Sequence, residues 1–202
     1  MQTKSVVMGL VAGLILGFVA ASAVLPGKTM MGGRFSSSDQ NGRMMGNIDR
    51  HFIEQMIPHH EGAIEMAKLA LEKSKRPEMI SLSNGIIEAQ QKEIIDMQRW
   101  YKEWFSTEVS KTSLYMVMGG MMGGASHMNS VGGDLDELRV AKDFDLEFIN
   151  QMIPHHEMAV MMASMLKSLT DRPEMKELAD DIISSQTREI EMMRSWAKVW
   201  NK

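Results

Sequence analysis

Apolar side chains recur at alternating spacings of four and three residues from Ile48 to about Lys73. This heptad-like period predicts an amphipathic helix with one stripe of side chains turned to a core. The residues of that stripe are Phe52, Met56, His59, Ala63, Met66 and Ala70. Pro58 falls inside the pattern and removes one backbone donor, so we expect the helix to bend at the histidines that follow it.

A second helix is predicted from Pro77 to Phe105, because Arg76 and Pro77 interrupt the first pattern and proline suits a first helical turn. Its inward face carries Leu82, Ile86, Gln90, Glu93, Met97, Trp100 and Trp104. A turn this short makes the two helices antiparallel neighbours. Counting back from the turn therefore places Glu93 level with the histidines of the first helix, and Met97 level with Met56.

The whole pattern is repeated 96 residues later, since Gln55 to Glu61 and Gln151 to Glu157 both read QMIPHHE. Each hairpin has an apolar seam that it cannot bury alone, so the two are expected to dock on each other. The prediction is an all-α, ferritin-like four-helix bundle made from two tandem helical hairpins, with a long Met- and Gly-rich crossover loop between them. Four tryptophans should fill the end of the bundle: Trp100, Trp104, Trp196 and Trp200.

The N-terminal segment combines Lys4 with an apolar run from Val6 to Leu25. This predicts a secretory signal over residues 1–23, although the run is also long enough for an uncleaved membrane anchor. Both alternatives place the rest of the chain outside the cytoplasm. The remaining predicted divisions are a flexible Met/Gly/Ser arm over 24–47, repeat one over 48–105, a Met-rich loop over 106–142 and repeat two over 143–202.

Methionine dominates the composition, with 23 copies among 202 residues, whereas cysteine is absent. Thioether sulfur suits Cu(I), and a chain without cysteine suits an oxidising compartment. Methionine also fills irregular cores and forms adaptable partner-binding surfaces, which is the plainer alternative. The formal net charge of −4 excludes a nucleic-acid partner, because binding phosphates needs a dense basic surface.

Each QMIPHHE copy sets histidine and methionine at helical spacings that suit a metal. Met56, His59 and Met66 share one face, since they are separated by three and seven residues. Cu(I) accepts few ligands, so one histidine and one or two methionines suffice. His60 points about 100° away, which leaves two roles open: ligation through the bend, or a hydrogen bond to Glu61 or Glu93 behind the ligands.

The complete set of residues predicted to bind copper extends this pattern to the second repeat and to two further segments. It comprises His59, His60, Met56, Met66, Met97, His155, His156, Met152, Met162, Met193, Met158, Met161, Met165, Met121, Met122 and His127. The last three lie in the crossover loop, which is either a second copper site or a plain linker. Met158, Met161 and Met165 form one flank of the third long helix. Their equivalents in the first repeat, Gly62, Glu65 and Leu69, suggest a partly solvated surface. This flank is therefore either a soft-metal patch or a docking face.

Catalysis is not expected. A di-iron oxidase site in a four-helix bundle needs a Glu-x-x-His motif on two helices, and neither repeat contains one. The sequence also offers no cysteine or serine nucleophile set. Two alternatives to copper binding stay open, namely a ferritin-like redox enzyme that oxidises its bound metal, and a Met-rich helical adaptor.

The tandem MIPHH segments, followed by Ala63, Met66 and the later Glu93, Met97 and Trp100, resemble a ferritin-like domain-of-unknown-function family of secreted bacterial proteins. The Met-rich arm and loop are similar to those of its copper-binding members from the cyanobacterial periplasm. The resemblance implies a four-helix bundle, export to the periplasm and copper binding tied to copper resistance and homeostasis. It implies ligation at His59, His60, His155, His156 and neighbouring methionines.

The expected cargo is copper, with Cu(I) favoured and Cu(II) as the alternative. The expected protein partner is a periplasmic copper-transfer or copper-sensor protein. Contact with a membrane is expected only if the N-terminal segment stays uncleaved.

Overall fold

The computed structural model describes the backbone of residues 37–110 and 133–200, and side chains from Ile48 onward within those ranges. The described residues all belong to one compact unit, which begins at Ser36. The predicted signal segment lies outside them, as do Met121, Met122 and His127 of the predicted loop. Within the described ranges, no helix has both the length and the apolar character needed to cross a membrane.

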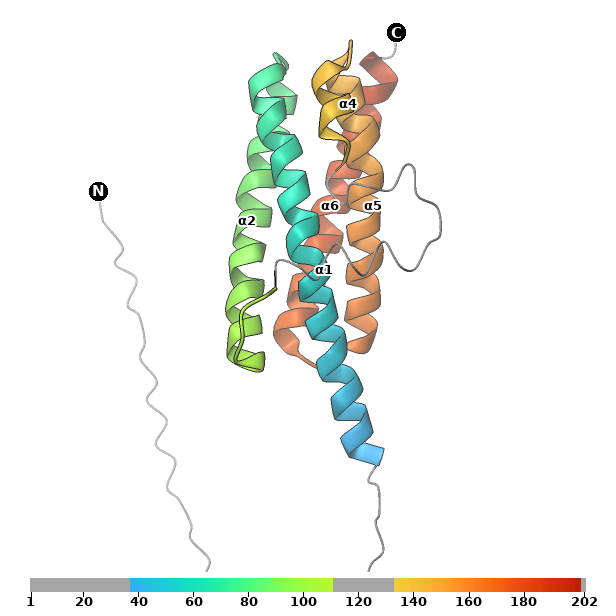
Figure 1. Ribbon diagram of the computed structural model, residues 1–202. Helices are drawn as coiled ribbons and strands as arrows, with labels where there is room; N and C mark the ends of the chain where they lie inside the picture. Colours follow the sequence, from blue (N-terminus) through green and yellow to red (C-terminus); the bar gives the residue numbers. More distant parts are fainter. Residues whose placement is uncertain (1–36, 111–132, 201–202) are drawn as a thin grey trace, which may run out of the picture. The chain divides into compact units, whose positions relative to one another are not determined.

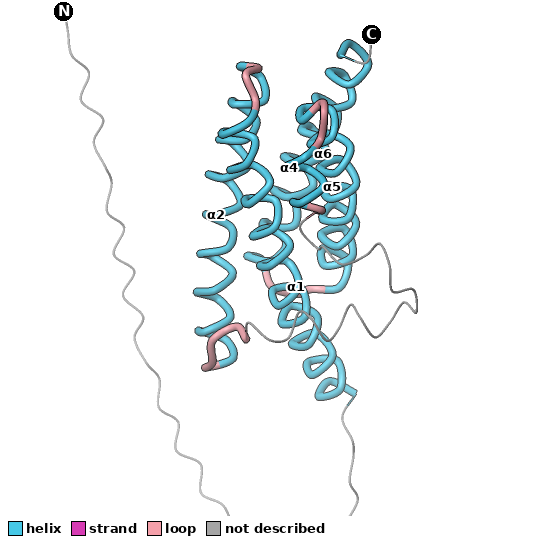
Figure 2. Tube along the Cα trace, turned by 45° about the horizontal axis from the view of Figure 1, so that its top comes forward, coloured by secondary structure: helices cyan, strands magenta, loops and turns pink. Residues whose placement is uncertain are grey.

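Every regular element over these ranges is a helix, which confirms the predicted all-α fold (Figures 1 and 2). The helices are α1 (Ser37–Lys73), α2 (Pro77–Phe105), α4 (Leu135–Val140), α5 (Phe144–Leu169) and α6 (Pro173–Trp200). Helix α2 begins and ends where the sequence predicts. Pro58 and Pro154 lie inside α1 and α5, and both helices continue through them.

Two predicted boundaries are wrong. The arm predicted over 24–47 is helical from Ser37 onward, because a helix that has formed a stable turn gains one hydrogen bond for each residue added. The loop predicted over 106–142 ends in the short helix α4. This helix follows the glycines, and the Asp134 side chain caps it by accepting hydrogen bonds from the amides of Asp136 and Glu137 at 3.1 and 2.9 Å.

The long helices form two hairpins, with α1 packed on α2 and α5 packed on α6. The hairpins meet mainly through α1 and α5. The six residues of the predicted inward stripe of α1 are at most 5% exposed, so the heptad-like spacing identified the buried face correctly. A second stripe next to it on the same helix is buried as well. Its residues are Ile53, Ile57, His60, Ile64 and Ala67. Two buried stripes account for the contact of α1 with two helices at once.

Arg76, at the turn of the first hairpin, connects the two hairpins. Its Nε donates to Asp145 Oδ2 at 2.9 Å, and its guanidinium lies over Trp200, 4.1 Å from the ring centroid. We call this set the Arg76 clamp. Because Arg76 follows the end of α1 and Asp145 begins α5, the two central helices run antiparallel.

The repeat equivalent of this contact lies at the opposite end of the bundle. Arg172 Nε donates to Asp49 Oδ2 at 3.1 Å, and its guanidinium lies 3.9 Å from the centroid of Trp104. This second set is the Arg172 clamp. The prediction that four tryptophans fill one end is therefore wrong: antiparallel docking sends equivalent residues to opposite ends, with Trp104 at one end and Trp200 at the other.

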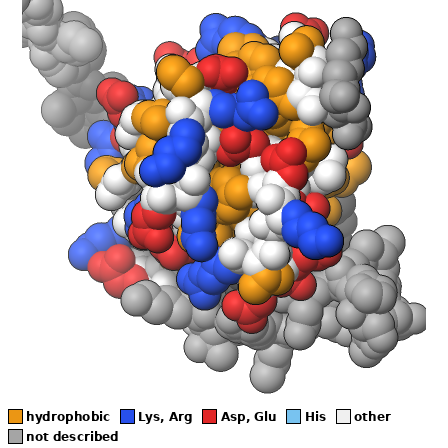
Figure 3. All heavy atoms as spheres, turned by 90° about the horizontal axis from the view of Figure 1, so that it is seen from above, with side chains coloured by type: hydrophobic (Ala, Val, Ile, Leu, Met, Phe, Trp, Pro, Cys, Tyr) orange, Lys and Arg blue, Asp and Glu red, His pale blue; other side chains and the backbone are white. Residues whose placement is uncertain are grey.

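The end of the bundle that carries the Arg76 clamp is seen face-on in Figure 3. Charged and apolar side chains mix on this face. No histidine is visible among its described atoms.

Candidate metal centre

Four histidines form a polar layer inside the bundle, between the two core clusters. His60 and His156 are fully buried, His59 is 2% exposed and His155 is 8% exposed. Adjacent histidines on one helix point in different directions, so each hairpin sends one ring toward the other hairpin and one toward its own second helix. The sequence motif thus builds a layer of four imidazoles from two helices.

His59 and His155 meet where α1 and α5 cross. Their ring centroids are 3.7 Å apart, with the planes inclined by 43°. These two residues are repeat equivalents, so the contact lies on the approximate two-fold axis that relates the hairpins.

Burial lowers the pKa of His59 well below its ordinary value, and the nearby rings of His155, His60 and His156 lower it further. The ring is therefore neutral over a wide pH range, which is the form that ligates metals. Among the described residues, neither ring nitrogen of His59 has a hydrogen-bond partner. An unpaired polar group in the core lowers stability, and a ligand bound at one of these ring nitrogens would remove part of that cost.

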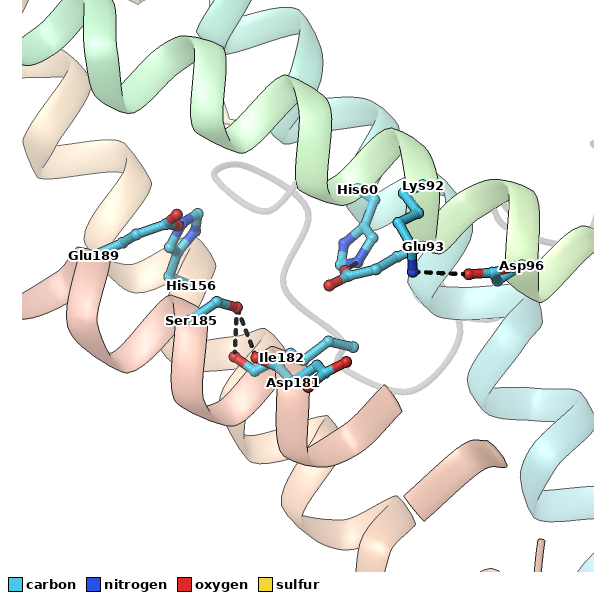
Figure 4. Close-up of polar contacts among 9 residues, drawn as sticks. All are labelled: His60, Lys92, Glu93, Asp96, His156, Asp181, Ile182, Ser185 and Glu189. Atoms are coloured by element: carbon cyan, nitrogen blue, oxygen red, sulfur yellow. Dashed lines mark hydrogen bonds and ion pairs between the residues drawn. The ribbon is translucent and has the colours of Figure 1, made fainter. Parts of the chain in front are cut away.

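The second ring of each pair contacts a carboxylate of its own hairpin. His60 Nε2 lies 2.6 Å from Glu93 Oε2, and His156 Nε2 lies 2.7 Å from Glu189 Oε2 (Figure 4). The prediction that Glu93 lies level with the histidines is confirmed. Of the two hydrogen-bond partners considered for His60, the structure has Glu93, while Glu61 is exposed.

Buried methionines flank the histidine layer on both sides. Met56 and Met97 share one core cluster, as predicted, whereas Met66 belongs to the other cluster together with Met152 and Met193. Since α1 and α5 are antiparallel, residues that follow His59 on α1 lie beside residues that precede His155 on α5, so Met66 packs on the same side of the layer as Met152.

Met162, the equivalent of Met66, packs correspondingly against the cluster of Met56 and Met97 and is only partly buried. Each methionine group thus combines residues of both hairpins.

Met158, Met161 and Met165 follow the outer face of α5 and are 37%, 59% and 52% exposed. The predicted solvated flank is confirmed on this helix. On α1 the comparison is partly wrong, because Leu69 is buried in the core while Glu65 is exposed. These three methionines are separate from the buried layer.

The inward position predicted for Gln90 is confirmed, but sequence reasoning did not single out this residue and its repeat equivalent as polar residues of the core. Gln90 and Gln186 are nearly fully buried, and the Oε1 atom of each has no hydrogen-bond partner within the part of the chain that is described. They are repeat equivalents that precede Glu93 and Glu189 by one helical turn. Their identity at the 96-residue offset was the available signal.

The layer combines neutral imidazole with thioether sulfur, and this donor set suits copper, with sulfur favouring Cu(I). Over the described side chains, no three His, Asp or Glu residues are grouped so as to hold a metal ion. The donors that the layer does bring together are histidine nitrogen and methionine sulfur, which can bind one ion jointly. His59 supplies unpaired nitrogen atoms, and Met56 and Met152 supply buried sulfur on either side.

Comparison with known proteins gives extensive matches among solved structures, several of which are structures of CopM. CopM in its Cu(II)-bound form is 50% identical, with a TM-score of 0.66, and the match covers 75% of this chain and 97% of CopM. CopM in its Cu(I)-bound form is 46% identical, with a TM-score of 0.65 and coverage of 76% and 98%. A silver-bound form of CopM gives 47% identity, a TM-score of 0.64 and coverage of 76% and 98%.

A shorter match is the uncharacterized protein L153 of Acanthamoeba polyphaga mimivirus. It is 47% identical over 51 residues, which make up 25% of this chain. The match spans about a third of that relative, or 34% of its length.

A family model also covers nearly the whole described bundle. The model for the domain of unknown function DUF305 matches residues 49–197, from the start of repeat one almost to the end of α6. The matched range contains both histidine pairs, both carboxylates that contact them, the whole Arg172 clamp, and Arg76 and Asp145 of the Arg76 clamp. The chain therefore belongs to the DUF305 family.

Proposed function

We propose that this protein binds copper in the periplasm and sequesters or delivers Cu(I) through methionine and histidine ligands, contributing to copper resistance and homeostasis. The observation that carries the proposal is the contact of His59 with His155 at 3.7 Å in a buried layer flanked by methionine sulfur. The CopM structures with Cu(I), Cu(II) and silver support it, since silver shares the preference of Cu(I) for soft ligands.

The two sides of the layer suggest more than one ion per chain. Met56 with Met97 lies in one cluster, and Met152 with Met193 lies in the other, so each side offers sulfur next to a shared histidine pair. The exposed Met158, Met161 and Met165 are a further proposed soft-metal patch. Their exposure suits exchange of an ion with a partner protein better than storage.

The test is an anaerobic titration of the mature protein with Cu(I) against a competing chelator. We expect uptake of two or more ions. Substitution of Met56 and Met97 by leucine keeps nearly the same volume and removes only sulfur, so the fold should survive while the Cu(I) stoichiometry or affinity falls. The exposed His51 lies outside the layer, and the H51A variant is the matched control.

Failure to take up copper in competition with the chelator would contradict the proposal. A variant lacking His59, His60, His155 and His156 that retained all its copper would instead assign binding to the methionine segments. Far-UV circular dichroism of each variant separates loss of ligands from loss of fold.

A further inference from the structure

His60 and His156 each present one ring nitrogen to a carboxylate. The Nε2–Oε2 distances of 2.6 and 2.7 Å to Glu93 and Glu189 are those of charge-assisted hydrogen bonds. An ionised carboxylate can only accept, so the proton in each bond belongs to the histidine. In the neutral ring, the proton is therefore on Nε2.

The other nitrogen of each ring is then the one with a free electron pair. Nδ1 of His60 and Nδ1 of His156 are both buried, and across residues 48–110 and 133–200 neither has a hydrogen-bond partner. The two rings stand beside the central pair, with centroids 6.4 Å from His59 and 6.1 Å from His155. Both repeats thus leave an unpaired nitrogen donor next to the histidines of the crossing point.

The carboxylates that make these bonds are not simply the nearest ones in sequence. Glu61 and Glu157 directly follow the histidine pairs, yet both are exposed, and Glu157 pairs with Arg194. Glu93 and Glu189 come from the facing helices α2 and α6, and each lies 33 residues after its histidine. Two independent copies of the hairpin therefore build the same contact across the same helix pair (Figure 4).

We propose that Glu93 and Glu189 are positioning residues that hold the proton of His60 and His156 on Nε2 and thereby present Nδ1 as the metal-binding nitrogen. A carboxylate on the far nitrogen of a histidine fixes its tautomer and orientation and makes the ligating nitrogen more basic. The metal-binding part rests on the proposed function, whereas the tautomer is a property of the metal-free protein.

The first measurement is a long-range proton–nitrogen NMR correlation of the histidine rings in the metal-free protein, which identifies the nitrogen that carries the proton. We expect Nε2–H for both His60 and His156. The E93Q variant replaces a group that only accepts by one that also donates, so the ring of His60 is no longer held in one tautomer. His156 is the internal control, because its partner Glu189 is unchanged.

Cu(I) affinity is then compared between the wild type and variants with substitutions at Glu93 and Glu61. We expect E93Q to weaken binding by about 10- to 100-fold, the range found for carboxylates behind metal-ligating histidines. E93D retains a carboxylate and should recover part of the loss. E61Q removes a carboxylate that does not contact the ring and should bind as the wild type does.

A wild-type spectrum with the proton on Nδ1 of both rings would overturn the proposal, and it needs no variant to fold. An E93Q protein that releases the proton from Nε2 yet binds Cu(I) with unchanged affinity would overturn it as well. Absence of Cu(I) binding in the wild type would refute the proposed function and leave the tautomer result standing. E189Q repeats the test in the second hairpin.

Discussion

Removal of the Arg172 side chain should separate the hairpins at one end more readily than removal of its repeat equivalent does at the other. In the Arg172 clamp, the guanidinium bonds to Asp49 at 3.1 Å and covers Trp104. The side chain of Asp49 is 2% exposed, and its Oδ1 atom has no partner among the described residues. The R172A variant therefore leaves a buried carboxylate without its counter-ion.

The magnitude follows from two losses. A hydrogen bond to a charged group contributes about 1.5 to 3 kcal/mol, and the cation–π contact with Trp104 adds roughly 0.5 to 1 kcal/mol at a partly exposed site. Arg172 is 37% exposed, which favours the lower half of both ranges. We expect R172A to lower the free energy of unfolding by about 2 to 3 kcal/mol.

The Arg76 clamp is the matched control. Its geometry is similar, and Asp145 Oδ1 likewise has no partner among the described residues, but the side chain of Asp145 is 14% exposed, so water reaches that carboxylate more readily when Arg76 is removed. R76A should therefore cost about 1 kcal/mol, close to the value of an exposed pair. Urea denaturation of the wild type and both variants, followed by far-UV circular dichroism, measures the difference.

Protonation of Asp49 gives a second signature. Burial raises the pKa of Asp49 above its ordinary value of 3.8, although Thr170 and Arg172 lower it, and loss of Arg172 should raise it further. A group whose pKa is higher in the folded than in the unfolded state destabilises the fold when it is ionised, and this loss of stability disappears as the pH falls through the folded-state pKa. The deficit of R172A should shrink in acid, and D49N should rescue R172A at neutral pH. Equal costs for R76A and R172A, or no rescue by D49N, would refute the role assigned to carboxylate burial.

Two further predictions concern the core. Gly133 has a φ of 79°, and a Cβ built there would lie 2.3 Å from Met66 Sδ. The G133A variant should therefore lose about 2 kcal/mol of unfolding free energy, through backbone strain and displacement of the sulfur. An unchanged midpoint of thermal unfolding would contradict this prediction. Burial holds the pKa of His59 well below 6.5, so in mild acid the unfolded chain binds a proton at this ring and the folded chain does not. As the pH is lowered from about 6.5, the free energy of unfolding should therefore decrease, by at most about 1.4 kcal/mol per pH unit. Urea midpoints at several pH values measure this slope, which should decrease in H59M; an equal slope in that variant would assign the effect to other groups.

Local periodicity was sufficient to predict the hairpins. Phe52, His59 and Met66 are buried because a heptad-like spacing leaves only one way to turn an apolar stripe inward. Pro77 marked the start of α2 because its missing amide proton costs nothing in a first turn. The level of Glu93 followed from helical rise alone.

The arrangement between the hairpins could not be predicted from the same pattern. The direction in which two amphipathic hairpins dock depends on contacts between residues far apart in the chain, such as Arg172 with Asp49. Without that direction, the sequence does not say which core cluster Met66 joins, and it places the four tryptophans wrongly at one end. The contact of His59 with His155 could not be predicted for the same reason, because it forms only when the two copies of the motif pack against each other.

The two clamps make the hairpin interface isologous, since each surface is matched by a copy of itself. An interface of this kind is closed: once α1 has met α5, both copies of the surface are used, and a further hairpin has no equivalent place to add. Duplication within one chain therefore has the effect of a dimer whose partner is always present at a ratio of one to one. The two histidines at the crossing point are brought together by folding alone, at any protein concentration.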